Sequence, residues 1–150
     1  MTPRPAGWTV AIVLGTGTLA VAQKVVGPEE FDRAMKTIGA AVEGVEEALG
    51  SASFVEAKTP LALARQVLAS TRPEWENNGQ PDAVRMNREA VAALDALDKA
   101  LSATTVEAAA VTAVLGSVNR ACDACHATYR EGDAQTGYRI RSTVSSGTPK

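Results

Sequence analysis

Hydrophobic residues recur at helical spacing in four segments of the chain. In residues 28–50 they lie three or four positions apart, so that they share one face of a helix. Residues 53–68, 82–101 and 104–129 have the same spacing, although Pro60 favours a later start or a bend in the second segment. Short connections between such helices favour an antiparallel arrangement. The pattern therefore predicts an all-α chain, folded as an antiparallel four-helix bundle.

Polar residues and turn formers mark the boundaries of these segments. Residues 53–56 and 104–107 match the capping-box pattern, in which Ser or Thr is followed three positions later by Glu. Residues 72–81 contain two prolines and an Asn-Asn-Gly turn signal, which predict a loop. Residues 133–150 are polar and aperiodic, and we expect them to form a flexible C-terminal tail.

Composition and charge narrow the range of functions. The chain has 150 residues, enough for one domain, of which 45% are hydrophobic and only 4% aromatic. This composition favours packed helices over a β-sandwich. A formal net charge of −2 argues against nucleic acid as a general partner. No run of about 18 apolar residues occurs, so the sequence excludes a typical multi-span membrane protein.

The first 22 residues have the pattern of a cleaved signal peptide. An apolar segment at residues 9–19 follows a basic residue, and Ala20-Val21-Ala22 supplies the small residues that favour cleavage before residue 23. The alternative is an uncleaved anchor helix, but Gln23 and Lys24 interrupt the apolar segment. We therefore expect export to a bacterial periplasm and no stable membrane span after cleavage.

The candidate chemistry lies in one short motif. Cys122, Cys125 and His126 form the pattern C-x-x-C-H and continue the apolar stripe of the last predicted helix. On a helix these residues share a face. Two thiols at this spacing can add to the two vinyl groups of one haem, and the adjacent imidazole can bind its iron. The motif therefore predicts one covalently attached haem c near the C-terminus.

Three other interpretations of the motif are weaker. A redox dithiol is expected within a βαβ pattern, which this helical sequence lacks. A zinc site needs further cysteine or histidine ligands, and the chain has two cysteines and one histidine in all. A disulfide between Cys122 and Cys125 would be strained on a regular helix and would close almost no loop.

The sequence resembles class II c-type cytochromes, the cytochrome c-prime family. The resemblance rests on the segment Cys122–Arg130, on Arg72-Pro73-Glu74-Trp75 and on Met35-Lys36-Thr37-Ile38-Gly39. It implies a cytochrome domain over residues 23–132, with His126 as the proximal ligand and the first helix over the distal haem face. It also allows a homodimer.

The residues alone leave three alternatives for the sixth coordination position of the iron. Once His126 is used, a methionine is the remaining soft neutral ligand, which leaves Met35, Met86 or an open site. The resemblance places Met35 at the distal position, as in low-spin members of the family. It also implies that Arg130 covers the proximal side of the imidazole. The alternative for Arg130 is an exposed cation at the end of a helix.

Two functions are consistent with a haem in this chain. A periplasmic electron carrier is the leading hypothesis, because a Met35 ligand would raise the reduction potential and exclude gases. The alternative is a five-coordinate, cytochrome c-prime-like protein that binds nitric oxide or carbon monoxide. A non-haem helical module would require both cysteines to be free. The sequence shows no nucleophile or acid–base pair, so we do not expect an enzyme, and it does not identify the redox partner protein.

Overall fold

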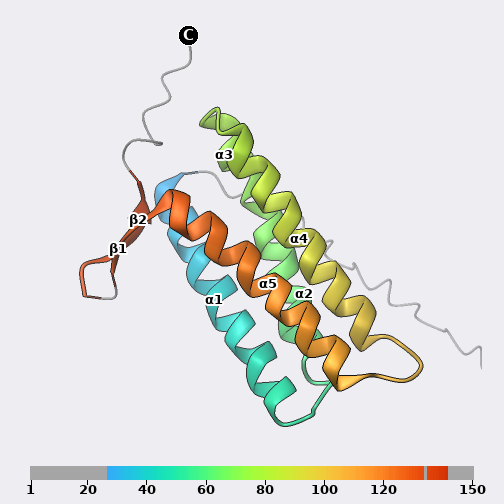
Figure 1. Cartoon of the computed structure of the whole chain (residues 1–150). Coiled ribbons are helices and arrows are strands. Elements are labelled where there is room, and N and C mark those ends of the chain that lie inside the picture. The colour runs from blue at the N-terminus through green and yellow to red at the C-terminus, as the bar shows by residue number, and fades with distance from the viewer. Residues whose placement is uncertain (1–26, 134, 142–150) are drawn as a thin grey trace, which may run out of the picture.

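The computed structural model describes residues 27–133 and 135–141. Within these residues the helices and strands are α1 (Pro28–Gly50), α2 (Lys58–Ser70), α3 (Arg72–Asn77), α4 (Pro81–Leu101), α5 (Ala108–Tyr129), β1 (Arg130–Asp133) and β2 (Gly137–Ile140), as Figure 1 shows. The chain is therefore mostly helical, as predicted, with a small antiparallel sheet added at the end of α5.

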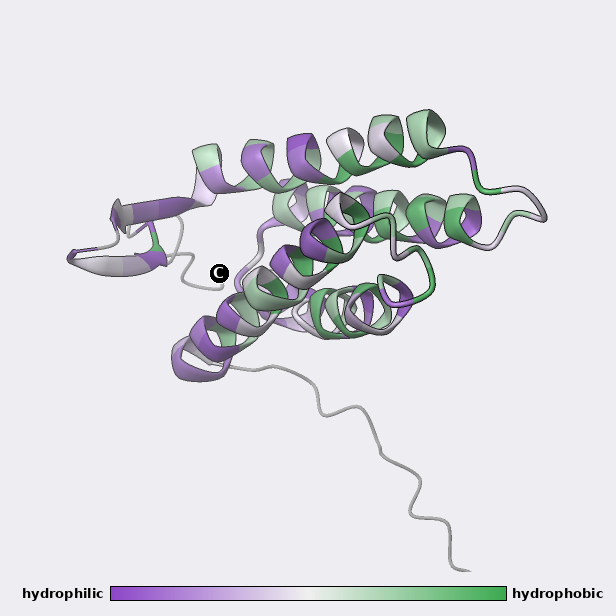
Figure 2. Cartoon of the chain, turned by 90° about the horizontal axis from the view of Figure 1, so that it is seen from below, coloured by the Kyte–Doolittle hydropathy of each residue, from purple (hydrophilic) through white to green (hydrophobic). Residues whose placement is uncertain are grey.

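The four long helices pack in a chain of neighbours: α1 lies against α2, α2 against α4, and α4 against α5. Figure 2 shows apolar residues on the faces that these helices turn toward one another. Leu61, Leu97 and Val118 are nearly inaccessible to solvent in the middle of the main core. The other buried members of this core are Ile38, Ala41, Val45, Ala57, Ala64, Leu68, Ala90, Leu94, Leu101 and Val111.

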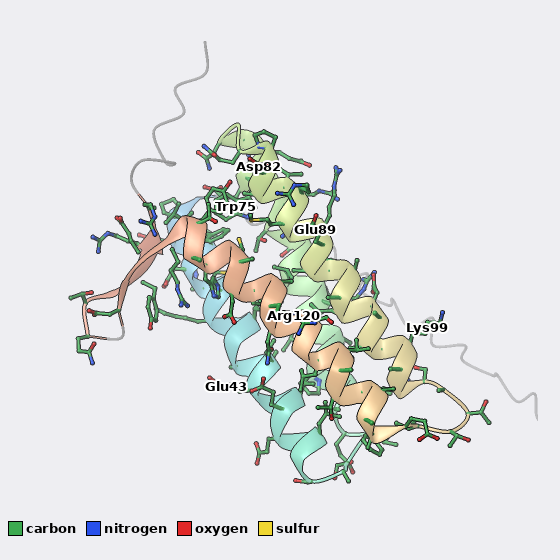
Figure 3. The ribbon with its side chains drawn as sticks, viewed as in Figure 1. Glu43, Trp75, Asp82, Glu89, Lys99 and Arg120 are labelled. Carbon is green, nitrogen blue, oxygen red and sulfur yellow. The ribbon has the colours of Figure 1, made fainter. Side chains whose placement is uncertain are left out.

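A second cluster lies at the end of the molecule where α1 begins and α5 finishes. We call it the end cluster, and its buried residues are Phe31, Trp75, Ala83 and Tyr129. The Trp75 ring lies 5.0 Å from the Phe31 ring and 5.1 Å from the Tyr129 ring, measured between centroids. Trp75 therefore connects α1 to α5 at this end (Figure 3).

Helices α1 and α5 themselves make few direct contacts. They run antiparallel, because α1 begins at the end of the molecule where α5 finishes (Figure 1). Asn119 on α5 donates a hydrogen bond to Glu46 on α1, with 3.0 Å between Nδ2 and Oε1. Away from this contact the two helices diverge toward the end that carries the β-strands (Figure 2).

Three boundaries differ from the sequence prediction. The predicted loop at residues 72–81 is wrong for its first part, because Pro73 and Glu74 occupy the first turn of α3, where proline and acidic residues are favoured. Helix α2 begins at Lys58 rather than near residue 53, so that Pro60 lies in its first turn and breaks no helical hydrogen bond. Helix α5 begins at Ala108, because the backbone of Glu107 is extended (φ −90°, ψ 108°).

Regular structure occupies part of the segment that we expect to form a flexible tail, because β1 ends at Asp133 and β2 covers Gly137–Ile140. Strands β1 and β2 pair antiparallel, with Arg130 opposite Ile140. Gly132 and Gly137 both have positive φ, and a Cβ on Gly132 would lie only 2.1 Å from the Gly137 carbonyl oxygen. The Asp133 carboxylate accepts hydrogen bonds from the Thr136 N–H and a neighbouring amide, an Asx turn that periodicity does not reveal.

Two predicted segments lie outside the described residues: the signal peptide at residues 1–22 and the part of the tail at residues 142–150. Within the described part of the chain, no helix is both long enough and apolar enough to cross a membrane.

A buried polar contact joins α4 to the α2–α3 corner, and its removal should be measurable. Asn87 is 4% exposed and donates hydrogen bonds to the Leu68 carbonyl (2.9 Å) and the Thr71 hydroxyl oxygen (3.0 Å). We expect Asn87→Ala to lower the free energy of unfolding by about 1–3 kcal/mol, because it removes two buried hydrogen bonds and leaves a void. Urea denaturation followed by circular dichroism measures this. Asn119→Ala, which removes the exposed hydrogen bond to Glu46, serves as the control. We expect it to change the free energy of unfolding by at most about 0.5 kcal/mol.

Candidate functional site

The predicted motif lies on the last turns of a regular helix. Cys122, Cys125 and His126 all belong to α5 and all are half-buried, and both cysteines are free thiols. The spacing of three and four residues places them on neighbouring positions of one helix surface. Cys122 packs against the main core and Cys125 against the end cluster. The prediction that the motif continues the last helix is confirmed.

The surroundings of the two sulfurs favour neutral thiols. Burial, and secondarily the charge of Asp123, raises the pKa of Cys122. Burial, with a smaller effect of Cys122, raises the pKa of Cys125 to about 11. Dithiol oxidoreductases instead lower the pKa of the attacking cysteine to obtain a thiolate near neutral pH. The environment therefore argues against the redox-dithiol interpretation.

The surroundings of the His126 imidazole favour its neutral form. Burial lowers its pKa, the positive charge of Arg130 lowers it further, and Asp123 opposes both effects. Neutral imidazole has a free nitrogen lone pair, which is the form that binds a metal. This part of α5 thus offers two sulfurs and one nitrogen donor within two turns.

One face of α1 is directed toward the same region. Met35, Gly39, Val42 and Glu46 are spaced by four, three and four residues and so share a helix face. Met35 and Val42 are only partly buried, and no atom lies within 4 Å of a Cβ built on Gly39. This face therefore combines apolar side chains with open space.

The hydrogen bond between Glu46 and Asn119 relates this face to the motif. Asn119 shares a face of α5 with Cys122 and His126, at spacings of three and four, so the bond turns the two faces toward each other. Because the helices are antiparallel, residues that precede Glu46 on α1 lie level with residues that follow Asn119 on α5. Met35 is therefore level with the end of α5, beyond Cys122.

Contacts with the end cluster support this correspondence. Met35 packs against that cluster from α1, and Cys125 packs against it from α5. The structure thus brings Met35 to the end of the molecule that carries the motif. Met86 on α4 borders the same cluster, so both candidate methionines lie in this region.

Trp75 has a larger role than the sequence suggested. The sequence places Trp75 in a predicted loop, whereas the residue lies on α3, is 4% exposed and packs between Phe31 and Tyr129. Burial also raises the pKa of Tyr129, and the negative charge of Asp82 adds to this effect. The signal that could have revealed the helix carrying Trp75 is Pro73-Glu74, a typical first-turn pair.

Arg130 does not continue along the helix face. It is the C-cap residue that follows α5, and it is also the first residue of β1. Its backbone is extended (φ −97°, ψ 137°). Its guanidinium carbon lies 4.3 Å from the centroid of the Tyr138 ring, in a cation–π contact. Arg130 therefore acts on His126 through its charge, while its side chain lies against β2.

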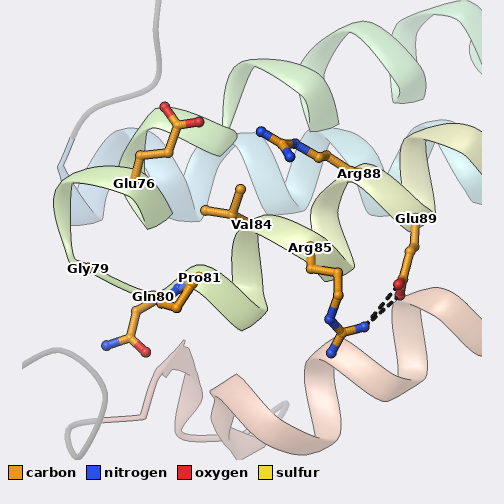
Figure 4. A pocket seen from close by; sticks show the side chains of 8 residues that line it. All are labelled: Glu76, Gly79, Gln80, Pro81, Val84, Arg85, Arg88 and Glu89. Atoms are coloured by element: carbon orange, nitrogen blue, oxygen red, sulfur yellow. Dashed lines mark hydrogen bonds and ion pairs between the residues drawn. The ribbon is translucent and has the colours of Figure 1, made fainter.

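A surface hollow away from the motif lies at the α3–α4 corner (Figure 4). Its lining includes Arg85, which pairs with Glu89 at 2.9 Å, and Glu76, which pairs with Arg72 at 3.1 Å. Neither the motif residues nor Met35 line it. Among the described residues, no group of three or more His, Cys, Asp and Glu side chains is placed to hold a metal ion.

Comparison of the chain with protein-family models, with curated proteins and with solved structures finds no match.

Proposed function

We propose that the chain is a periplasmic c-type cytochrome that carries single electrons through one covalently attached haem c. Cys122 and Cys125 would form the thioether links to the haem, and His126 and Met35 would bind its iron. The observation that carries the proposal is the joint placement of Cys122, Cys125 and His126 on one half-buried surface of α5.

The donor set fits haem c better than a bare metal ion. Two thiols and one imidazole supply too few ligands for a closed zinc site, and no further His or Cys exists in the sequence. The same three groups match the needs of haem c, which are two thiols for its vinyl groups and one nitrogen for its iron.

The opposing face of α1 fits the other side of such a group. Met35 offers a thioether sulfur at the same end of the molecule as Cys125. Gly39 has open space around its Cα, and Val42 adds apolar surface on the same face. A large apolar macrocycle between α1 and α5 would bury these partly exposed groups.

The arrangement of the helices supports the same assignment. The four long helices α1, α2, α4 and α5 would form an antiparallel four-helix bundle, with α3 as part of the α2–α4 connection. In class II cytochromes, which the sequence resembles, the attachment motif also lies at the end of the last helix. The predicted signal peptide would deliver the chain to the periplasm.

The residues of the chain would position the group and control access to it. When bound, the haem iron supplies a one-electron ferric–ferrous couple. His126 would hold the iron from α5, and Met35 would close the opposite side, which excludes gases and raises the reduction potential. The buried ring of Trp75 connects α1 to α5 at this end through Phe31 and Tyr129.

The state of the two cysteines tests the proposal. We express the chain in a bacterium that exports and matures c-type cytochromes, denature the purified protein and treat it with iodoacetamide. We expect the mass of one haem added to the polypeptide and no alkylation, because thioether sulfurs do not react. The double variant Cys122→Ser/Cys125→Ser is the matched control and should retain no haem after denaturation.

An optical spectrum before and after carbon monoxide then separates the two haem functions. Low-spin bands that carbon monoxide leaves unchanged support the electron carrier. A high-spin spectrum that shifts with carbon monoxide contradicts Met35 ligation and supports gas binding. Alkylation of both cysteines, with a mass equal to the bare polypeptide, overturns the haem proposal altogether.

A further inference from the structure

The last turn of α5 is capped by a residue that lies beyond the β-hairpin. A helix leaves its final four carbonyl groups without intrahelical partners. Here the His126 carbonyl accepts the Arg130 N–H, and the Tyr129 carbonyl accepts the backbone N–H of Arg141 at 2.8 Å. The two carbonyls between them therefore need donors from elsewhere.

The Arg141 side chain supplies those donors. Its Nε donates to the Thr128 carbonyl (3.1 Å), and its Nη2 donates to the Ala127 carbonyl (3.2 Å) and to the Arg130 carbonyl (3.1 Å). The planar guanidinium suits this task because its donors form a rigid fork. Its positive charge also lies at the negative end of the helix dipole. The side chain thus satisfies three of the four carbonyls of residues 127–130, and the backbone N–H of Arg141 satisfies the fourth.

The hairpin carries Arg141 back to the helix by several independent contacts. Strands β1 and β2 pair over their full length, and Arg139 forms a 3.0 Å ion pair with Glu131 across them. Ile140, next to Arg141, packs against the end cluster that Cys125 also borders. The hairpin is therefore attached both to the carbonyl end of α5 and to the apolar cluster beneath it.

We propose that the hairpin is a clamp on the last turn of α5 and that Arg141 is the positioning residue of this clamp. By holding the carbonyls of residues 127–130, it fixes the helical geometry of the turn that presents Cys125 and His126. The clamp itself concerns the polypeptide alone. Its effect on a haem held by His126 rests on the proposed function.

Amide hydrogen exchange, measured residue by residue on the purified full chain, tests the clamp. In Arg141→Ala we expect the amides of residues 126–130 to exchange about tenfold faster or more, because their turn loses three accepted hydrogen bonds. Arg139→Gln is the matched control: it alters the same hairpin but leaves the carbonyls capped, and it should exchange like the wild type. Arg141→Lys keeps the positive charge but lacks the forked donors of the guanidinium. It should therefore protect the amides of residues 126–130 from exchange only in part.

Two results overturn the clamp. One is equal exchange of residues 126–130 in Arg141→Ala and Arg139→Gln. The other is an equal loss of protection in the middle of α4 and in the last turn of α5, which would mean that Arg141 acts on global stability only.

A second measurement concerns the haem-loaded protein. The low-spin electron paramagnetic resonance signal of the oxidised protein should shift in Arg141→Ala and stay unchanged in Arg139→Gln, because it reports the orientation of the axial ligands. An unchanged signal in Arg141→Ala overturns the effect on the ligand. A purified chain without haem contradicts the proposed function, yet the exchange comparison still decides whether the clamp exists.

Discussion

Replacing Trp75 with alanine is expected to lower the free energy of unfolding by about 3–5 kcal/mol. The indole is 4% exposed and packs edge-on against Phe31 and at a tilt against Tyr129. Few direct contacts connect α1 with α5, so this side chain carries much of their interaction at the end where they diverge. Its removal leaves a cavity, because a close-packed interior relaxes only in part around a lost side chain.

The measurement is urea denaturation followed by circular dichroism at the helix bands, because Trp75 is one of only two tryptophans and its loss changes the fluorescence. Tyr138→Ala is the control. It removes an aromatic residue that is 49% exposed and should change the free energy of unfolding by at most about 0.5 kcal/mol. Trp75→Phe keeps an aromatic ring and should lose less than Trp75→Ala. Equal stabilities of Trp75→Ala and Tyr138→Ala would contradict the role of the end cluster.

The helices of this chain were predictable because their signals are local. Helix α1 begins at Pro28 and finishes at Gly50, as the proline, the acidic first turn and the apolar stripe predict. The buried face is slightly rotated from the expected stripe: Ala34 and Ala41 are buried, while Met35 and Val42 are only partly so. Small side chains allow close approach to α2, a preference that hydropathy alone does not register.

The parts that could not be predicted depend on contacts between distant residues or on special backbone angles. Arg141 follows a polar segment without periodicity, and its partners lie more than ten positions earlier in the chain. The hairpin that delivers it requires positive φ at Gly132 and Gly137. Glycine in a polar stretch predicts a turn but gives neither its partner strand nor its register.

In the candidate site, too, the local features could be predicted and the contacts between distant residues could not. The placement of Cys122, Cys125 and His126 on one helix surface follows from their spacing, and the structure confirms it. The side chain opposite them depends on the register between α1 and α5, which are joined by the Glu46–Asn119 hydrogen bond and the Trp75 contacts. The sequence could therefore name Met35 and Met86 as candidates but could not choose between them without the family resemblance.

Met35→Leu is the variant that decides between these methionines in the haem-loaded protein. Leucine has nearly the volume of methionine, so we expect a stability change below about 1.5 kcal/mol. It lacks the thioether, so we expect the spectrum to change from low-spin to high-spin and carbon monoxide to bind stoichiometrically. The reduction potential should fall by on the order of 0.1 V, within the roughly 0.8 V range that axial ligands span.

Met86→Leu is the matched control, because Met86 borders the same end cluster from α4 and also is partly buried. It should leave the spin state, the response to carbon monoxide and the potential unchanged. If Met86→Leu changes the spectrum and Met35→Leu does not, the ligand comes from α4 and the opposing face of α1 serves only as a cover. If the wild type is already high-spin and binds carbon monoxide, neither sulfur is a ligand. Met35 would then act as a steric barrier over an open site, because its position on α1 still brings it to the end that carries Cys125.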